Sequence, residues 1–337
     1  MAKKKERKNR LKKGMKRASA RAQAVRKKYS LKERAFGLIE LARPLEWSKP
    51  LLNMTIAALI AFYVFSAQFS LELFAIGFVS VAMLWSGLYA LNDFTDTKLD
   101  AAHAVKKNRP IPSGKISPRQ ALFFSSFLIT LSLFIAFSLI ENIALTICLL
   151  AMLANQLFYT LEPWRLKSRK IFDIISGSMI NPLFRYLSGL ALFMPFHGPA
   201  SAAFPILPII FVIAMQFSGY SLYRAFSKSH DIKMKMKSTI AAFGEKKVKL
   251  ASYIVAAIGI IAYFGMIANG ITVMDPNFGY LPFQYIWSII PVLFFLPMLK
   301  GAILSPEKSD LKGTYRIFYA MTIAFIIGNA AVFAILP

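Results

Sequence analysis

The segment LELFAIGFVSVAMLWSGLYALNDFTDTKLD occupies residues 71–100 and joins two kinds of sequence. Residues 71–91 are largely apolar, and Glu72 is their single charged residue. A run of about 20 such residues is long enough to cross the ~30 Å hydrocarbon core of a bilayer as a helix. Residues 92–100 follow without a break and contain three aspartates. The segment therefore predicts a membrane-spanning helix that ends in an acidic cluster.

The composition of the whole chain supports a membrane location. Hydrophobic residues make up 56% of the 337 residues, and Phe alone supplies 30. Charged residues make up 17%, well under the roughly 25% of an average soluble protein. A soluble fold has no means of burying so much apolar surface. The single cysteine, Cys148, excludes a disulfide scaffold and a CxxC metal or redox site, and three His argue against a His-rich metal site.

Eight further segments resemble residues 71–91 in length and apolar character. The nine expected spans lie near residues 50–68, 71–91, 119–140, 143–160, 171–194, 203–226, 248–268, 283–303 and 315–335. Loops without Lys or Arg alternate along the chain with loops that are rich in both. The positive-inside rule then places the basic loops and the N-terminus in the cytoplasm. The sequence predicts an all-α, multi-pass integral membrane protein.

The N-terminal residues form a separate, strongly basic region. The first 34 residues hold 16 of the 41 Lys and Arg residues, within a chain of net charge +25. We expect residues 1–40 to be a cytoplasmic tail, either disordered or lying on anionic lipid headgroups, and residues 41–337 to form the membrane domain. No aromatic residue precedes Tyr29 to stack on bases, so nucleic acid is not an expected partner.

The three aspartates of residues 92–100 predict a divalent-cation site. If the helix continues, Asp93, Asp96 and Asp100 stand at i, i+3 and i+7 and share one face. Three carboxylates at a membrane edge repel each other and lose hydration, and a divalent cation relieves both costs. Oxygen ligands without His or Cys favour Mg²⁺. The alternative is a solvated helix end with ordinary acids.

A basic, proline-rich loop follows the aspartates. Residues 106–115 read KKNRPIPSGK, and two prolines and a glycine predict a shaped loop. We expect Lys106, Arg109 and Lys115 to neutralise phosphate oxygens beside the cation. A loop that only serves as a positive-inside signal is the alternative.

The two motifs together resemble the UbiA superfamily of intramembrane prenyltransferases. Asn92, Asp93, Asp96 and Asp100 match the family signature NDxxDxxxD, and the NRPIPSG continuation is similar to members that act on lipid or chlorin acceptors. The resemblance covers roughly residues 40–337. It implies a nine-helix bundle in which the acids hold Mg²⁺ on an isoprenoid diphosphate at the cytoplasmic mouth. It also implies an apolar tunnel that opens laterally to lipid.

Other positions resemble family features that contact substrate. The loop 159–167 is similar to a tyrosine-, proline- and RLK-containing loop, and Asn181 and Arg185 match a polar pair of the fifth span. Arg43, Trp47 and Lys49 stand at the start of the first span, where a role as membrane anchors is the alternative. The substrate-binding residues expected from motifs and resemblance are Asn92, Lys49, Lys106, Arg109, Lys115, Tyr159, Lys167, Asn181, Arg185, Tyr220, Arg224 and Lys228.

The chain departs from the family after the sixth span. The usual second acidic motif, about DxxxD, is replaced by a stretch in which Asp231 is the nearest acid. The sequence therefore does not predict a second metal held by two carboxylates, and Arg224 and Lys228 would replace it electrostatically. Asp231 is also the candidate general base. Phe158, Tyr159 and Tyr220 are candidate aromatic walls for an allylic cation.

These features predict an Mg²⁺-dependent enzyme that moves an isoprenoid group from an allylic diphosphate to an aromatic, lipid or other polar acceptor. One family branch, the decaprenyl-phosphate phosphoribosyltransferases, shares the RPxxWxK entry at Arg43–Lys49 and a poorly acidic second motif. Transfer of phosphoribose to a polyprenyl phosphate is therefore the alternative. A transporter of organic anions is a remote third. Its polar site would be expected near the midplane, whereas the aspartates stand at a helix end.

Overall fold

A computed structural model describes residues 29–101, 106–194, 205–233, 237–267, 281–305 and 310–336. These residues are helical and contain no strand, which confirms the expected all-α class for the described part of the chain. Residues 1–28 of the predicted basic tail (residues 1–40) lie outside the described residues. The chain divides into two compact units, a smaller one of residues 1–44 and 86–128 and a larger one of residues 45–85 and 129–337.

The smaller unit begins with a helix that starts before the expected domain boundary at residue 40. Helix α2, Leu31–Ala42, opens with a capping box in which Ser30 and Glu33 satisfy each other's backbone N–H groups. The unit continues with the end of α4 (Leu71–Thr95), α5 (Thr97–Ala101), the 3-10 turn η2 (Lys106–Asn108) and the start of α6 (Pro118–Phe134). Its apolar core comprises Leu41, Ala90, Ile111, Ile116 and Ala121.

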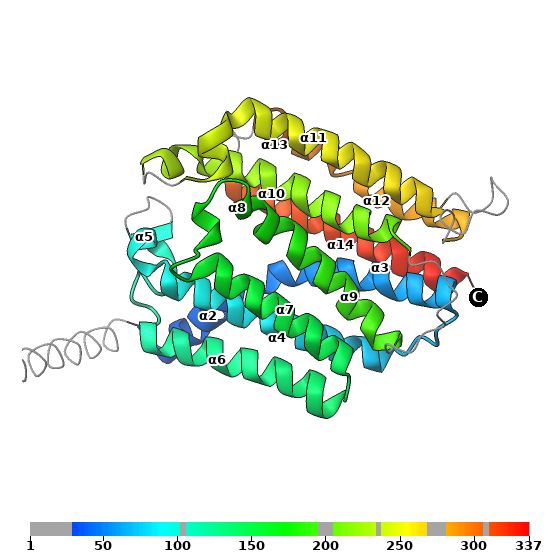
Figure 1. Ribbon diagram of the computed structural model, residues 1–337, viewed down its shortest axis with the longest axis horizontal. Helices are drawn as coiled ribbons and strands as arrows, with labels where there is room; N and C mark the ends of the chain where they lie inside the picture. Colours follow the sequence, from blue (N-terminus) through cyan, green and yellow to red (C-terminus); the bar gives the residue numbers. More distant parts are fainter. Residues whose placement is uncertain are drawn as a thin grey trace, which may run out of the picture. The chain divides into compact units, whose positions relative to one another are not determined.

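The larger unit holds most of the long helices, which Figure 1 labels. Its principal helices are α3 (Ser48–Phe65), α7 (Ile143–Thr160), α8 (Phe172–Ile175), α9 (Asn181–Phe193), α10 (Leu207–Lys233), α11 (Thr239–Ile267), α12 (Ile290–Leu293), α13 (Leu296–Leu304) and α14 (Leu311–Ile335). Short turns complete it, namely η1 (Pro44–Trp47, from the unit boundary), η3 (Ile135–Leu139), η4 (Leu166–Ser168), η5 (Ser176–Ile180) and η6 (Phe283–Ile289). A π-helical η5 joins α8 to α9 without a break.

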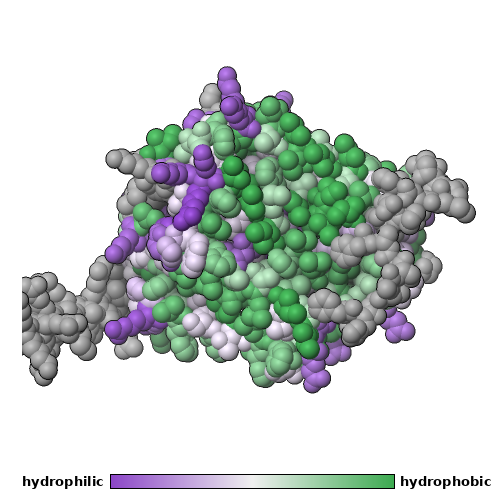
Figure 2. All heavy atoms as spheres, viewed as in Figure 1, coloured by the Kyte–Doolittle hydropathy of each residue, from purple (hydrophilic) through white to green (hydrophobic). Residues whose placement is uncertain are grey.

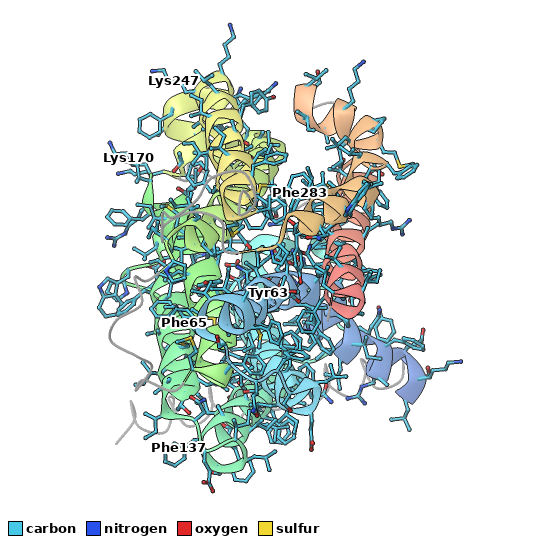
Figure 3. All side chains as sticks on the ribbon, turned by 90° about the vertical axis from the view of Figure 1, so that its right-hand side faces the viewer. Tyr63, Phe65, Phe137, Lys170, Lys247 and Phe283 are labelled. Atoms are coloured by element: carbon cyan, nitrogen blue, oxygen red, sulfur yellow. The ribbon has the colours of Figure 1, made fainter. Side chains whose placement is uncertain are left out.

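Small and polar side chains bring these helices together, as is common within membranes. Helices α10 and α11 run side by side (Figure 1), and the hydroxyls of Ser218 and Ser252 lie 3.0 Å apart between them. Helices α3 and α9 meet where an added Cβ on Gly189 would lie 2.8 Å from the Cα of Met54. Tyr63 of α3 lies among the helices of this unit (Figure 3), and its hydroxyl accepts from that of Tyr285 at 3.4 Å.

The described residues contain fewer candidate membrane spans than the nine expected from the sequence, and nine crossings stay a prediction. Within the described residues, six helical stretches are long and apolar enough to cross a bilayer, or seven if the pair bent by 69° at residues 293–296 forms one span. The expected spans near 171–194 and 203–226 form helices but are not among the six. Polar residues such as Asn181, Arg185, Gln216 and Arg224 lower their apolarity. Figure 2 shows apolar side chains over much of the visible face, as an integral membrane protein requires.

Candidate active site

The aspartate-rich segment keeps its helical register beyond the end of α4. The backbone N–H of Asp96 donates to the carbonyl of Asn92 at 3.0 Å, and that of Asp100 donates to the carbonyl of Asp96 at 2.8 Å. These bonds have the i to i−4 pattern of an α-helix. The expected continuation of the helix is confirmed, and Asp93, Asp96 and Asp100 lie on one side of it.

Two of these carboxylates meet at the guanidinium of Arg109. Its Nη1 donates to Oδ1 of Asp93 at 3.0 Å and to Oδ2 of Asp100 at 2.8 Å. The side chains of Asp93 and Asp100 are only 3% and 4% exposed. Because one nitrogen contacts both oxygens, the two carboxylates converge on a single point.

Two further cations face the same carboxylates. Nη2 of Arg43 donates to Oδ1 of Asp93 at 2.6 Å, and its guanidinium carbon lies 4.9 Å from the centre of the Tyr89 ring. Nζ of Lys106 lies 3.9 Å from Oδ1 of Asp100. Arg43 has a left-handed φ of 52°, and this turn at the end of α2 sets the starting direction of its side chain. The two buried acids thus contact three cationic side chains, and the charge of Asp96 also acts on Asp100.

The environment of Asp100 opposes its ionisation. Burial raises the pKa of this carboxyl above its ordinary 3.8, and the neighbouring charges of Asp93 and Asp96 act in the same direction. Arg109 and Lys106 oppose the shift by favouring the carboxylate. The raised pKa shows that the cations only partly offset the loss of hydration.

The donor set at this point suits a hard divalent cation. Within the described residues, no three or more Asp, Glu, His or Cys side chains are already grouped as metal ligands. Two buried carboxylates nevertheless converge on one positively charged nitrogen, Nη1 of Arg109. A cation taking that place would meet carboxylate oxygens, the ligand type that Mg²⁺ prefers. The residues therefore fit Mg²⁺, while the predicted ligation by all three aspartates stays a prediction.

The proline-rich loop presents Arg109 through its own hydrogen bonds. The N–H of Ser113 donates to the carbonyl of Arg109, and that of Ile116 donates to the carbonyl of Pro110, at 3.0 and 2.9 Å. Gly114 has a φ of 83°, a left-handed conformation that glycine adopts without strain. The shaped loop expected from the sequence is confirmed. The ammonium group of Lys115 pairs instead with the carboxylate of Glu40 in α2, at 3.0 Å.

The larger unit contains a second buried cluster built around Arg224 of α10. Its guanidinium donates to the carboxylate of Asp231, and Nη2 lies 3.5 Å from Oδ2 of Asp173. Ser238 also donates to Asp231, at 2.6 Å. The backbone N–H of Thr239, at the start of α11, donates to Asp173 at 3.1 Å. Two acids thus contact Arg224, and its predicted role in replacing a second metal stays a prediction.

Comparison with known proteins identifies the family of this chain. Residues 52–329 match the profile described as "UbiA prenyltransferase family". The chain belongs to the UbiA prenyltransferase family. Among solved structures, a UbiA homolog from Archaeoglobus fulgidus bound to GPP and Mg²⁺ is similar, with a TM-score of 0.65. It shares 19% identity, and the alignment covers 88% of this chain and 99% of that one. This similarity shows the fold.

Curated relatives of this UbiA family member differ in their names. Protoheme IX farnesyltransferase from Shewanella baltica is 29% identical over 124 residues, 37% of this chain, so the chain spans about two fifths (40%) of that relative's length. Digeranylgeranylglyceryl phosphate synthase from Methanococcus maripaludis is 28% identical over 71% of this chain and 79% of the relative. Decaprenyl-phosphate phosphoribosyltransferase from Mycolicibacterium smegmatis is 30% identical over 44% of this chain and 46% of the relative.

Of the three aromatic residues predicted to line an allylic cation, two contact each other in this UbiA family member and the third packs elsewhere. The hydroxyls of Tyr159 and Tyr220 lie 2.7 Å apart. Phe158 instead packs edge-on against Trp164, with ring centres 5.0 Å apart, and is 44% exposed. Exposure of this size is typical of a surface or lipid contact. A role in a cation wall is better supported for the two tyrosines and stays a prediction.

The predicted polar pair of residues 181 and 185 is buried. Asn181 Oδ1 accepts from Nδ2 of Asn155 at 2.8 Å. The guanidinium carbon of Arg185 lies 3.9 Å from the centre of the Trp85 ring, and its Nη1 donates to Gln216 at 3.3 Å. Contact of either residue with a substrate stays a prediction.

Three predicted lysines lie in different surroundings within the larger unit. Lys49 pairs with Glu46 at 2.6 Å, and Lys228 lies 3.5 Å from Glu245. Lys167 is only 6% exposed. None of these contacts reports on a substrate, so the binding roles of the three lysines stay predictions.

Sequence reasoning missed Asp173. This fully buried acid stands at the start of α8, 51 residues before its partner Arg224. The available signal was a single acid at the edge of an apolar run, which is costly to bury without a cation. Asp231, predicted as a general base, is itself held by Arg224 and Ser238. Its predicted role as a base stays a prediction.

Proposed function

We propose that this protein is an Mg²⁺-dependent intramembrane prenyltransferase. It would move an isoprenoid group from an allylic diphosphate to a lipid, aromatic or other polar acceptor and release diphosphate. The observation that carries the proposal is the convergence of Asp93 and Asp100 on Arg109, beside Arg43, in a UbiA family member. A buried acid pair in contact with three cationic side chains suits a metal diphosphate.

The cations of the smaller unit would bind the diphosphate. Arg43, Lys106 and Arg109 carry three positive charges against the two carboxylates they contact. Charge-assisted hydrogen bonds from arginine to phosphate oxygens are short, and two can form in parallel. When the allylic carbon–oxygen bond breaks, the electron pair stays on the departing diphosphate. Donors already positioned at those oxygens lower the energy of that charge.

The aspartates would hold the metal ion. We propose Asp93, Asp96 and Asp100 as its ligands. Mg²⁺, when bound, offsets the charge on the leaving oxygens. The part of this chain is to supply oxygen ligands at one helix end and to exclude water from them, which the burial of Asp93 and Asp100 supports.

The acceptor atom would then bond to the allylic carbon and lose its proton. A lipid acceptor is supported by the relative named digeranylgeranylglyceryl phosphate synthase, which matches over 71% of this chain. Phosphoribosyl transfer to a polyprenyl phosphate is the second candidate, because a relative with that activity in its name matches over 44% of the chain. The longer match favours prenyl transfer.

The orientation of the chain is a further part of the proposal. Lys and Arg are concentrated in the loops that precede or follow alternate helices, which supports a cytoplasmic N-terminus and cytoplasmic Asp93 and Arg109. Membership in the prenyltransferase family argues against the organic-anion transporter.

The experiment that tests the function uses the purified full chain in proteoliposomes with Mg²⁺ and a total lipid extract. Radiolabelled geranylgeranyl diphosphate and phosphoribosyl diphosphate are supplied in separate reactions. We expect label from the first to enter lipid, and Asp93→Asn to abolish its transfer. Glu72→Gln is the matched control, since Glu72 is an exposed acid at the other end of α4. Label entering lipid from phosphoribosyl diphosphate alone would replace prenyl transfer by the second candidate.

A further inference from the structure

Helix α2 and the residues next to its two ends contact the Arg109 loop and the aspartate helix at three points. At its start, the Tyr29 hydroxyl donates to the carbonyl of Ser113 at 3.3 Å. In its middle, Glu40 accepts from Lys115 at 3.0 Å. Directly after its end, Arg43 donates to Asp93 at 2.6 Å. The helix thus contacts both the aspartate helix and the loop that carries Arg109.

The inner face of α2 fits that loop closely. A Cβ added to Gly37 would lie 2.7 Å from Cδ of Lys115 and 3.0 Å from Cγ1 of Ile116. Leu41 is fully buried in the core that also contains Ile116. Movement of α2 away from the loop would therefore separate packed atoms as well as ion pairs.

The outer face of α2 exposes three large apolar side chains, beside the charged Lys32, Glu33 and Glu40. Leu31, Phe36 and Ile39 are 83%, 57% and 54% exposed. Leu31 and Ile39 stand at i and i+8, two turns apart on one side, and Phe36 lies on an adjoining row. Lys32 is exposed among them. A helix with a large apolar face, next to basic residues, has the character of one that lies in the interface of a bilayer.

The sequence before α2 indicates the kind of bilayer. Residues 1–28 contain 14 Lys and Arg residues and one acid, Glu6. Basic residues next to a membrane surface are attracted by anionic lipid headgroups within about one Debye length, roughly 8–10 Å. This charge and the apolar face of α2 are continuous in the chain and complement the same surface.

We propose that the outer face of α2 docks into the headgroup region of an anionic lipid leaflet, and that this contact braces the Arg109 loop against the aspartates. Lipid contact on Leu31, Phe36 and Ile39 would hold the helix from outside. Its inner contacts through Tyr29, Glu40 and Arg43 would transmit that restraint to the site. Arg43 and Glu40 are positioning residues in this respect.

The docking is tested with a fluorophore on single cysteines in a Cys148→Ala background. Full-length protein is placed in phosphatidylcholine vesicles with or without phosphatidylglycerol, and lipids spin-labelled near the headgroup serve as quencher. We expect quenching at Ile39→Cys that increases with phosphatidylglycerol and falls at high salt. Arg119→Cys, an exposed position of the same unit outside α2, is the control and should be quenched less. Equal quenching at the two positions would overturn the docking.

Other coverings of this face give different results. If a water-soluble thiol reagent fails to reach Ile39→Cys and the lipid label fails to quench it, then protein covers the face and the proposal is wrong. Quenching that does not change with phosphatidylglycerol or salt would overturn the assignment to anionic lipid.

The brace is tested by amide hydrogen exchange in residues 109–116. In vesicles with phosphatidylglycerol, we expect Phe36→Gln with Ile39→Gln to speed exchange there, with no such change in Phe172→Gln. Phe172 is a comparably exposed aromatic residue, at 53%, in the larger unit. Unchanged exchange in the double variant would refute the brace. None of these measurements depends on turnover, so they are independent of the proposed prenyl transfer.

Discussion

Replacement of Arg109 by methionine tests whether its guanidinium occupies a cation site. Arg109→Met keeps an unbranched side chain but removes the nitrogen that lies 3.0 Å from Asp93 and 2.8 Å from Asp100. The variant leaves two buried carboxylates with Arg43 and Lys106 as their remaining cationic contacts among those described above. Without divalent cations, the protein should therefore lose stability.

The size of that loss follows from the two hydrogen bonds. A hydrogen bond to a charged group contributes about 1.5–3 kcal/mol. Arg109 is 26% exposed, and Arg43 still binds Asp93, so values at the lower end apply. We expect the free energy of unfolding to fall by about 3 kcal/mol in the absence of divalent cations.

Mg²⁺ should reverse most of this loss. Bound ligand stabilises the folded state by about 2.7 kcal/mol when its concentration is a hundredfold above its Kd. In the unchanged protein Mg²⁺ must compete with the Arg109 guanidinium for the point between the Asp93 and Asp100 carboxylates. In Arg109→Met no guanidinium occupies that point. The stabilisation by Mg²⁺ should therefore be larger in Arg109→Met. Transfer activity should still fall by about 10²–10³, because a donor to the diphosphate is missing.

The assay is thermal unfolding in detergent, with EDTA or with Mg²⁺. Arg119→Met, an exposed arginine of the same unit, is the matched control and should behave as the unchanged protein in both conditions. Equal stability of Arg109→Met and the unchanged protein in EDTA would refute the structural role of the bridge. An equal response to Mg²⁺ would refute the overlap of Arg109 with the metal site.

Three further changes test other parts of the structure. Asp93→Asn should abolish the Mg²⁺-dependent release of diphosphate while Glu72→Gln retains it, and release of diphosphate by Asp93→Asn would contradict the ligand assignment. Burial raises the pKa of Asp100 above 3.8, so acidification should weaken Mg²⁺ binding at a higher pH than it would for a site built from aspartates of ordinary pKa. This loss of Mg²⁺ affinity on acidification should be smaller in Asp100→Asn. The same shift means that the contribution of Asp100 to stability is present below pH 3.8 and is lost as pH rises through its folded pKa. Arg224→Met should lower the free energy of unfolding by about 3–5 kcal/mol, because it leaves buried acids unpaired. Adding Asp231→Asn should restore part of that loss in the same unfolding assay. An Arg224→Met variant as stable as the unchanged protein would contradict the pairing of Arg224 with these acids.

In each of the two arginine clusters one arginine contacts two aspartates, but the clusters differ in the number of cations beside them. In the smaller unit, Arg109 joins Asp93 and Asp100, and two more cations stand beside them. In the larger unit, Arg224 joins Asp173 and Asp231. The contacts of the first cluster join two acids to three cations, whereas those of the second join two acids to one cation. Replacement of a second metal by the charge of Arg224 stays a prediction.

Much of the fold and part of the site were predictable from local patterns. Apolar runs of about 20 residues predict helices because a backbone in lipid must satisfy its own hydrogen bonds. The spacing of Asp93, Asp96 and Asp100 predicts one face because helical periodicity is fixed by geometry. The prolines and Gly114 predict the turn that presents Arg109. The expected spans near 171–194 and 203–226 form helices, but polar residues buried between helices lower their apolarity, so nine crossings stay a prediction.

The amino-acid sequence alone determined which residues are helical, which carry charge and which side of a helix they occupy. Only the tertiary structure decided their partners: Arg109 between two aspartates, Arg43 on Asp93, and Asp173 beside Arg224. Helical periodicity acts over a few residues, whereas these pairs are 9 to 51 positions apart along the chain. Buried charges select partners by the free energy of leaving water, and which opposite charge comes within reach depends on how the helices pack.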